Sequence, residues 1–480
     1  MISNILQYLD RAAQLWPDRV VLSGEDGDLT FLELRELADH VGSFLCRKGI
    51  FRQPVGIRMP RGTRAFAMAL GCVAGGCWFS FLDPQMPPLR AQKILDSLQP
   101  PGVIGDTWEA ELLLREPIDS AALSSVRQRS ASCDPIYAVF TSGSTGEPKG
   151  VIGCHRAVID YIENLCPVLK ADADTVFGSH APLYVDAWLK ELFPALKYGG
   201  KMVLIPQRLF SFPVQLVQFL NGHKINTLCW VVSALTGVSG TGTLRTIRPE
   251  HLKTVAFASE VFPPEQLKLW REALPQTRFL NLYGPTEATG ICCWHEVSGD
   301  EEGPIPIGKP LANTEVFLHE GEICIRGDRL TLGYLGEDQG GFTSDPRGYP
   351  GRIYRTGDLG AWNEKGQLLF LGRKDSQIKH MGYRIELGEI EAAAWKLPGI
   401  TGAGCVYLPE QNCLVLCYSG TPLPEELRRH LRQLLPKPMV PRRIRRMETL
   451  PRTPNGKLRR SALLDIERNG TYGKTVEDTH

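Results

Sequence analysis

The stretch YAVFTSGSTGEPKGVI, residues 137–152, carries the strongest signal in this sequence. Apolar residues lead into it and out of it, so we expect a loop between two strands. The loop contains three glycines, four Ser or Thr hydroxyls and Lys149. Glycine lets backbone N–H groups approach an anion, hydroxyls donate hydrogen bonds, and an ammonium neutralises charge. The composition therefore favours a phosphate-binding loop.

The loop departs from the common nucleotide-triphosphate pattern G-x-x-x-x-G-K-[ST]. Glu147 and Pro148 separate Gly146 from Lys149, and Gly150 stands where that pattern requires Ser or Thr. Clusters of Gly, Ser and Thr also form ordinary turns. On this stretch alone, both interpretations stay open.

Length and composition indicate a globular protein with more than one lobe. The chain has 480 residues, of which 43% are hydrophobic and 22% charged, and its net charge is +1. This length exceeds what one hydrophobic core usually holds, so we expect two or three lobes. The near-zero net charge gives no general attraction to nucleic acid or to a membrane surface.

Neither a secretion signal nor a disulfide framework is indicated. The N-terminal segment MISNILQYLDRAAQLWPDRV predicts an amphipathic helix, and no later apolar run reaches the roughly 20 residues that span a bilayer. The thirteen cysteines are scattered without a C-x-x-C pair, which argues against a structural zinc site. We therefore expect a cytoplasmic protein with no membrane insertion and no nucleic-acid partner.

The hydrophobic patterns predict an α/β fold with a large N-terminal lobe and a small C-terminal domain. Residues 28–130 alternate helical patterns with short apolar strands, and the alternation returns over 157–293, so we expect two βα-layered subdomains. Short strands after residue 315 predict a β-barrel-like subdomain, and the patterns after residue 375 predict a hinged α+β unit of about 90 residues. The expected domains are an N-terminal core at 1–373, a mobile lid at 374–466 and a disordered tail at 467–480.

Four further motifs follow the first one along the chain: NLYGPTEATG at 281–290, YRTGDLG at 354–360, GRKDSQIKHMGYRIELGEIE at 372–391 and PRTPNGKLRR at 451–460. In this order and spacing, the five motifs resemble the adenylate-forming (ANL) superfamily over about residues 5–465. The match is closest to its amino-acid-activating branch, which comprises nonribosomal peptide synthetase adenylation domains and stand-alone D-alanine–carrier-protein ligases. The resemblance implies a ligase in which a carboxylate attacks the α-phosphate of ATP and expels pyrophosphate.

The resemblance also implies a nucleotide site that uses ATP and Mg²⁺. Glu287 would hold Mg²⁺, which prefers oxygen ligands, and Thr286 would contact the α-phosphate. Taken alone, Glu287 also fits a helix-initiating acid and Asp358 a turn residue. The remaining nucleotide contacts would come from the phosphate loop (Thr141, Ser142, Gly143, Ser144, Thr145, Lys149), from Tyr283 beneath the adenine with Gly284 beside it, and from Asp358 and Arg373 at the ribose.

Three residues near the C-terminus are implied to act in the two half reactions. Lys457 would bring its ammonium to the carboxylate oxygen and the α-phosphate as charge builds there. The alternative interpretation of Lys457 is a solvated lysine in a turn. Asp375 would be the hinge about which the small domain swings. Gly382 would then line the tunnel for the acceptor thiol, since a narrow passage needs backbone without a side chain, or it simply forms a turn before a helix.

Asp186 aligns with the aspartate that binds the substrate's α-ammonium in amino-acid-activating relatives, although it also fits a helix N-cap. Phe257 would favour a small substrate side chain, whereas Lys190 would pair with a substrate carboxylate or point to solvent. Val185 and the segment Ala258-Ser259-Glu260 depart from the family pattern, which has an aromatic residue and Gly-Gly-Glu there. The other expected substrate contacts are Ala187, Ser233, Val255, Leu282, Gly290 and Ile291.

The acceptor is expected to be the phosphopantetheine thiol of a separate carrier protein, because too few residues follow Lys457 to form a carrier domain. The basic segment 428–460 is either its landing surface, through electrostatic steering, or an ordinary solvated face. Two other interpretations stay open: an acyl- or aryl-CoA synthetase, which Asp186 argues against, and a catalytically idle nucleotide-binding relative.

Overall fold

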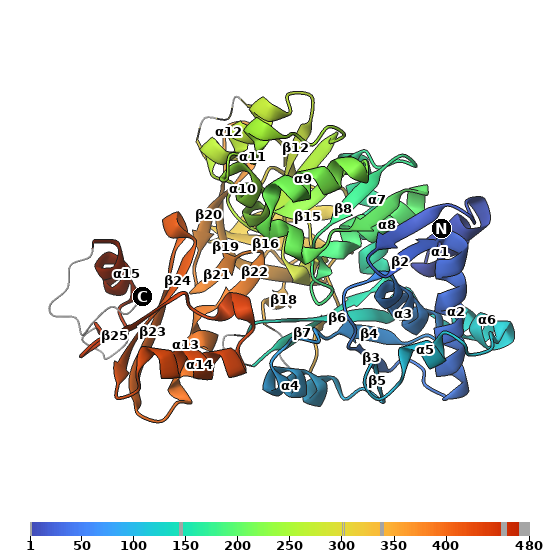
Figure 1. The fold of residues 1–480 in the computed structure, drawn as a ribbon, viewed down its shortest axis with the longest axis horizontal. Helices are drawn as coiled ribbons and strands as arrows, with labels where there is room; N and C mark the ends of the chain where they lie inside the picture. Colours follow the sequence, from blue (N-terminus) through green and yellow to red (C-terminus); the bar gives the residue numbers. More distant parts are fainter. Residues whose placement is uncertain are drawn as a thin grey trace. The chain divides into compact units, whose positions relative to one another are not determined.

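The computed structural model describes residues 2–143, 147–299, 301, 303–336, 340–452 and 458–469 (Figure 1). The chain forms two compact units. Unit 1 comprises Met1–Pro84, Leu98–Phe140 and Gly150–Lys374, and unit 2 comprises Gln85–Ser97, Thr141–Lys149 and Asp375–His480. Lys457 and most of the tail expected to be disordered, 467–480, lie outside the described residues.

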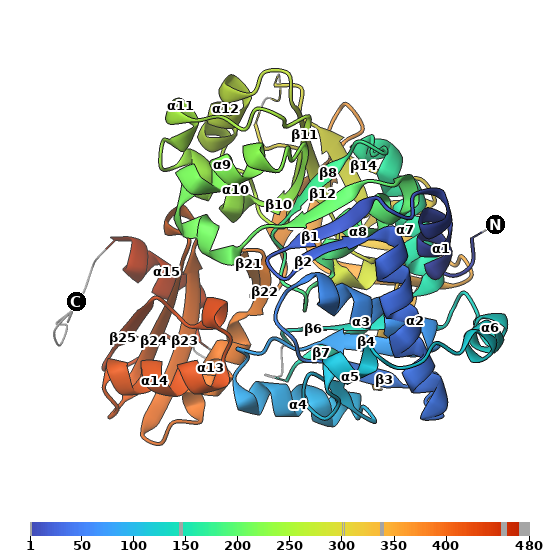
Figure 2. The same cartoon turned by 45° about the vertical axis from the view of Figure 1, so that its right-hand side comes forward.

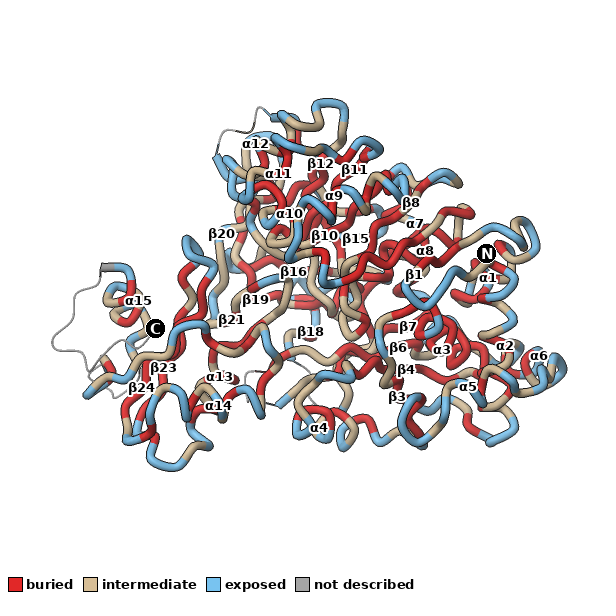
Figure 3. Tube along the Cα trace, viewed as in Figure 1, coloured by how far each residue is buried: buried red, intermediate tan, exposed pale blue. Residues whose placement is uncertain are grey.

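A nine-stranded sheet forms the centre of unit 1, in the order β14-β13-β12-β11-β10-β8-β9-β1-β2. The strands from β12 to β1 run parallel, and antiparallel strands close both ends. The central strands are buried along most of their length (Figure 3). The strands are β1 Val20–Gly24, β2 Gly27–Thr30, β8 Val176–Ser179, β9 Lys201–Leu204, β10 Thr227–Val231, β11 Thr254–Ala258, β12 Arg278–Tyr283, β13 Cys293–Glu296 and β14 Lys309–Pro310.

Helices connect these strands as the βα pattern predicts. Among them, α9 begins with Pro213, whose fixed φ suits a first helical turn and which needs no N–H partner there. The helices are α7 His155–Leu169, α8 Leu189–Tyr198, α9 Pro213–Gly222, α10 Val232–Ser239, α11 Thr243–Thr246 and α12 Pro264–Ala273.

A second sheet of unit 1 has the order β17-β7-β6-β4-β3-β5. Thr30 begins the adjoining helix α2 with a capping box, since its side chain accepts from the Glu33 N–H and Glu33 returns the bond. Helix α3 is buried at every position except the exposed Arg64, which explains why its residues from Ala65 onward are apolar or glycine. The elements are β3 Pro54–Ile57, β4 Trp78–Phe81, β5 Val103–Ile104, β6 Pro135–Thr141, β7 Lys149–Cys154, β17 Gly333–Tyr334, α1 Leu6–Leu15, α2 Phe31–Arg47, α3 Thr63–Ala74, α5 Ala110–Leu113 and α6 Ser120–Arg129.

The third subdomain of unit 1 is an antiparallel sheet around the long strand β19, which bonds to β16, β18 and β20. One end of β19 pairs with β18 and the other end pairs with β20, and the pairing with β20 contains a register shift at Leu359/Gly360. The strands are β15 Thr314–His319, β16 Glu322–Gly327, β18 Phe342–Ser344, β19 Arg352–Trp362 and β20 Leu368–Arg373.

Unit 2 is built on the three-stranded sheet β23-β24-β25 (Figure 2). Alternate residues of β24 enter two cores: Leu414 and Leu416 pack with α13 and α14, whereas Val415 and Cys417 pack with α15. The elements are α4 Pro88–Leu98, β21 Gln377–His380, β22 Tyr383–Glu386, α13 Leu387–Trp395, β23 Ile400–Leu408, β24 Cys413–Gly420, α14 Pro424–Leu434, β25 Arg443–Arg446 and α15 Arg460–Asn469.

The predicted fold class is confirmed: two βα-layered sheets, a β subdomain and a small α+β domain are all present. All thirteen cysteines are in the described part and are free thiols. Within that part, no helix combines the length and the apolar character that crossing a bilayer demands.

Candidate active site

The phosphate loop lies where the sequence predicts it, between the end of β6 at Thr141 and the start of β7 at Lys149. A Cβ on Gly143 would lie 2.2 Å from the Glu147 carbonyl, so the tight return of the loop requires glycine there. Within unit 2, the Ser142 hydroxyl donates to the Arg384 carbonyl (2.6 Å) and accepts from the Glu386 N–H (3.2 Å). Ser144 and Thr145 lie outside the described residues.

Three of the predicted nucleotide residues lie together in unit 1. The Tyr283 hydroxyl donates to Asp358 Oδ2 at 2.5 Å, and the Arg373 guanidinium pairs with Asp358 Oδ1. β12 ends at Tyr283, and the β19–β20 pairing places Arg373 opposite Asp358. Asp358 is 3% exposed, so its charge is compensated by Arg373 rather than by water. A carboxylate has acceptor sites to spare for the two hydroxyls of a ribose.

Thr286 and Glu287 lie in a short 3-10 turn, Thr286–Ala288, that follows Pro285. Glu287 is buried and accepts a hydrogen bond from the Tyr334 hydroxyl. Thr331 holds the Glu287 backbone, because its N–H and its hydroxyl both donate to the Glu287 carbonyl at 2.9 and 3.1 Å. The described residues contain no cluster of three His, Cys, Asp or Glu side chains that would hold a metal unaided. A single fixed carboxylate fits Mg²⁺ bound largely by phosphate oxygens.

A strained turn joins the nucleotide and substrate residues. Thr289 and Gly290 both have positive φ, +54° and +91°, and a Cβ on Gly284 would lie 2.2 Å from the Gly290 carbonyl. The turn therefore needs the glycine at 284 for a close approach of two backbone segments. Strain of this kind persists only where neighbouring groups hold the backbone in place.

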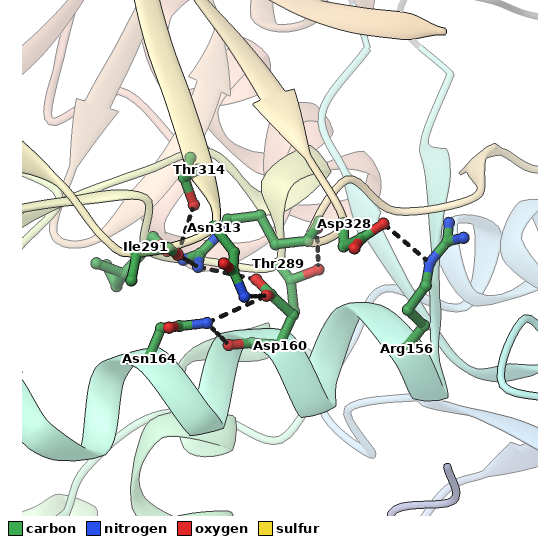
Figure 4. A network of polar contacts seen from close by, with 10 residues as sticks. Arg156, Asp160, Asn164, Thr289, Ile291, Asn313, Thr314 and Asp328 are labelled. Carbon is green, nitrogen blue, oxygen red and sulfur yellow. Dashed lines mark hydrogen bonds and ion pairs between the residues drawn. The ribbon is translucent and has the colours of Figure 1, made fainter. Parts of the chain in front are cut away.

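The buried Arg329 supplies that restraint. Figure 4 labels three of the residues that it contacts, Asp160, Thr289 and Ile291. Its guanidinium donates to the carbonyls of Ile291 and Ala312 and pairs with Asp160 of α7 at 2.9 Å, while its own carbonyl accepts from the Thr289 hydroxyl. One side chain thus ties the turn at 289–291 to a helix and to a second loop. Sequence reasoning missed Arg329, because a single arginine within a predicted strand region carries no motif.

Asp186 opens a 3-10 turn before α8, and its Oδ2 oxygen is buried without a hydrogen-bond partner among the described residues. A Cβ on Gly290 would lie 3.9 Å from this oxygen, so the carboxylate lies beside the strained turn. Burial raises the pKa of Asp186, against the lowering effect of Lys190 and of Thr286. The N-cap alternative is not what the structure shows, because Asp186 makes no side-chain cap.

A cluster of buried charges lies next to Asp186. Lys190 is 6% exposed, so it does not point to solvent, and its Nζ donates to the Ala187 carbonyl at 3.1 Å. Glu191 is fully buried, and neither of its carboxylate oxygens has a hydrogen-bond partner in the described part of the chain. Burial raises the pKa of Glu191 to about 7, against the charges of Lys190 and Arg61. His180 is neutral, since burial lowers its pKa to about 3.

The structure divides the other expected substrate contacts between two faces of the nine-stranded sheet. Leu282 and Ile291 belong to the core that also contains Tyr161, next to Asp186, whereas Val255 and Phe257 belong to the core behind the sheet. The register pairs Ala258 with Leu282 and Phe257 with Asn281, so successive residues of β11 face opposite ways.

This division corrects the expectation that Val255 and Phe257 share a surface with Leu282. The residues of β11 on the Asp186 side are Ala256 and Ala258, one position away. Ser233 lies at the start of α10, where its N–H donates to Glu260 at 2.7 Å. Ser259 has φ +75°, a conformation that favours the glycine of the familiar Gly-Gly-Glu pattern.

Two of the C-terminal residues lie in described parts of unit 2. Asp375 is its first residue after the boundary with unit 1 and accepts from the Gln377 N–H at 3.1 Å. Gly382 and Met381, with φ of +79° and +51°, form the two-residue turn between β21 and β22. This turn type requires positive φ at both positions, which explains the glycine structurally.

Comparisons with known proteins agree with this arrangement. The sequence profile of the AMP-binding enzyme family matches residues 9–335, and that of the AMP-binding enzyme C-terminal domain matches residues 389–457. The chain belongs to the AMP-binding enzyme family. The resemblance to the adenylate-forming superfamily is therefore confirmed.

Curated relatives of this AMP-binding enzyme are large peptide synthases. The chain is 31% identical to the dimodular nonribosomal peptide synthase of Bacillus subtilis (strain 168), covering 96% of the chain and 21% of that protein. It is 30% identical to bacitracin synthase 3 of Bacillus licheniformis, covering 99% of the chain and 8% of that protein. The chain thus spans only a small part of the length of these two relatives.

Solved structures show the same fold. Holo-PA1221, an NRPS protein containing adenylation and PCP domains, matches with a TM-score of 0.82 and 25% identity over 96% of this chain and 84% of that one. The Vibrio cholerae adenylation domain AlmE, in complex with glycyl-adenosine-5'-phosphate, matches with a TM-score of 0.84 and 20% identity over 98% of each chain. The o-succinylbenzoate CoA synthetase of Bacillus subtilis matches with a TM-score of 0.82 and 21% identity over 95% and 98%.

Glu191 generates a prediction about stability and pH. Its pKa is raised on folding from 4.5 to about 7, so folding favours its protonated form. The resulting stabilisation is complete below about pH 4.5 and is lost as the pH rises through 7, with a slope of at most about 1.4 kcal/mol per pH unit. We expect the free energy of unfolding of wild type, relative to Glu191→Gln, to fall over this window and then level off.

The measurement is denaturant unfolding at several pH values between 4 and 8.5. Glu272→Gln, an exposed glutamate of α12, is the matched control and should show no such window. A difference between wild type and Glu191→Gln that stays constant with pH would contradict the burial argument.

Proposed function

We propose that this enzyme activates an amino acid as its aminoacyl-AMP, releases pyrophosphate, and transfers the aminoacyl group to the phosphopantetheine thiol of a separate carrier protein. The observation that carries the proposal is the buried Asp186 Oδ2, which lacks a partner among the described residues and lies beside the turn that follows Thr286 and Glu287. A buried carboxylate is costly unless paired, and the α-ammonium of an amino acid would pair with it. Membership of the AMP-binding family supports the AMP-forming step.

The residues of unit 1 take distinct parts in this reaction. Asp186 binds the ammonium, which leaves the substrate carboxylate to face the nucleotide. Tyr283, Asp358 and Arg373 hold the adenosine, and their mutual contacts fix the carboxylate that would receive the ribose hydroxyls. Thr286 contacts the α-phosphate. When bound, Mg²⁺ on Glu287 neutralises phosphate charge.

Residues of unit 2 complete the chemistry in this proposal. The loop from Thr141 to Lys149 binds the β- and γ-phosphates of ATP, with Lys149 as its cation. Lys457 stabilises the charge that develops as the carboxylate attacks the α-phosphate, an effect of several kcal/mol for a well-placed donor. Residues 374–466 then swing about Asp375 so that Gly382 lines the thiol path. Movement about one residue at the end of an element is ordinary hinge behaviour.

Amino-acid-dependent exchange of labelled pyrophosphate into ATP tests the activation step. We expect exchange with at least one amino acid and Mg²⁺, and none with the corresponding deaminated acid, because Asp186 would then remain unpaired. Lys457→Ala should lower exchange by about 100-fold or more, as for loss of one transition-state donor, and should largely spare thiol transfer from a preformed adenylate.

The exposed Lys396→Ala, which lies in unit 2 outside the basic segment 428–460, is the matched control and should leave both steps unchanged. Equal loss of both steps in Lys457→Ala would contradict its assigned role. Deaminated acids that work as well as amino acids would instead favour an acyl- or aryl-CoA synthetase, and transfer to CoA would then exceed transfer to a carrier.

The carrier is proposed to dock on the basic face of unit 2. Arg429 and Arg432 lie three residues apart on α14, are exposed and have no ion-pair partner among the described residues. The same holds for Arg442 and Arg446, near and in β25. Positions three apart on a helix share one face. An acidic carrier would be steered to such a face at low ionic strength.

The double variant Arg429→Glu/Arg432→Glu tests this surface with a phosphopantetheinylated carrier domain of a peptide synthetase as the probe. We expect the KM for the carrier to rise about 10-fold at low salt and pyrophosphate exchange to stay unchanged. The control Arg245→Glu/Arg248→Glu reverses two exposed arginines of unit 1 and should not alter the carrier KM. Equal KM values for both double variants would contradict the assignment.

A further inference from the structure

Lys190 is a buried ammonium with unused hydrogen-bonding capacity. An ammonium has three donors, yet the described residues give Nζ a single bond, to the Ala187 carbonyl. No carboxylate of the described chain lies within 4 Å of it, although Asp186 and Glu191 are near enough to respond to its charge. A buried charge without a close counter-ion is costly unless a ligand supplies one.

The groups around Lys190 provide no excess of negative charge. Lys190 and Arg61 are positive and Asp186 is a carboxylate, whereas burial raises the pKa of Glu191 to about 7 and lowers that of His180 to about 3, which leaves His180 neutral. Arg61 has committed its guanidinium to the carbonyls of Ala181, Ser179 and Ile205, so Lys190 is the cation with donors to spare. An arriving α-ammonium adds one positive charge to this cluster. A negative group on the side chain of the same substrate would offset this added charge.

The side chains that the sheet presents on this face are small. Lys190 and Glu191 both influence the Cys229 thiol, which places them near β10. The register sets Cys229 beside Ala256, and Ala258 follows two residues later on the same face. These side chains end at Cβ or Sγ. Phe257, whose bulk would favour a small substrate, packs against Phe262 behind the sheet with ring centroids 4.9 Å apart.

We infer that the amino acid activated by this enzyme carries a carboxylate on its side chain, and that Lys190 binds this carboxylate while Asp186 binds the α-ammonium. The inference rests on the proposed amino-acid activation and adds the substrate class. The two charged residues lie four positions apart, Asp186 in the 3-10 turn and Lys190 in the first turn of α8, so one short segment recognises both ends of a dicarboxylic amino acid. The α-carboxylate stays available for adenylation.

Pyrophosphate exchange with matched pairs of acidic and amide substrates tests this inference. L-Glutamate and L-aspartate are compared with L-glutamine and L-asparagine, which have the same shape without the charge. We expect kcat/KM to favour at least one acid over its amide by about 10- to 100-fold, the range for a charge-assisted bond in a buried site. Lys190→Met should abolish this preference by lowering activity on the acid alone.

Two further variants separate recognition from folding. Lys190→Arg keeps the charge and should retain part of the preference for the acid. Lys197→Met removes another lysine of α8, which pairs with Glu163 at 2.7 Å, and should leave the preference intact. A Lys190→Met enzyme that loses activity equally on acids and amides would overturn the inference.

The outcome also distinguishes this inference from the function on which it rests. Exchange with neutral amino acids but not with either acid would overturn the substrate class and leave amino-acid activation standing. Absence of exchange with every amino acid would overturn both.

Discussion

The proposed chemistry of unit 1 depends on the Asp186 carboxylate, which is kept out of water with one oxygen unpartnered among the described residues. Such a group destabilises the empty protein, because an unsatisfied buried acceptor costs about 1–3 kcal/mol. The cost is tolerable when a ligand removes it at each turnover. The attraction between a bound ammonium and this carboxylate is stronger because the carboxylate is already out of water, where charges are screened less.

The backbone next to Asp186 is fixed by hydrogen bonds from buried side chains. Arg329, buried and paired with Asp160, fixes the carbonyl of Ile291, and Thr331 fixes that of Glu287. Together they maintain a turn whose positive φ values would otherwise relax. The restrained segment contains residues assigned to the substrate and residues assigned to the α-phosphate and Mg²⁺. In the proposed reaction, one segment would therefore position both the substrate and the phosphate that its carboxylate attacks.

Local signals predict much of this molecule. The Gly/Ser/Thr composition of 141–149, bounded by apolar residues, predicts a loop between two strands, and β6 and β7 end and begin there. Hydrophobic periodicity likewise predicts a strand at 201–206, a helix at 213–221 and a strand at 227–232. The elements β9, α9 and β10 match these ranges to within one or two residues. The joint placement of Tyr283, Asp358 and Arg373 follows from motif order, although 90 residues separate the first from the last.

Other features lie beyond local signals. Whether Phe257 or its neighbours face the Asp186 side of the sheet depends on strand register. An error of one residue moves a side chain to the opposite face. The network of Arg329 joins segments far apart in the chain, and the sequence does not indicate that Arg329 or Lys190 is buried. The contact of Ser142 with Arg384 spans 242 residues and is equally invisible in the sequence.

The most direct test of this account is a crystal structure of the enzyme with a non-hydrolysable analogue of glutamyl- or aspartyl-AMP. The account predicts the α-ammonium within hydrogen-bonding distance of Asp186 Oδ2 and the side-chain carboxylate on Lys190 Nζ, with the adenosine against Tyr283 and Asp358. An α-ammonium placed elsewhere, with Asp186 still unpartnered, would contradict it.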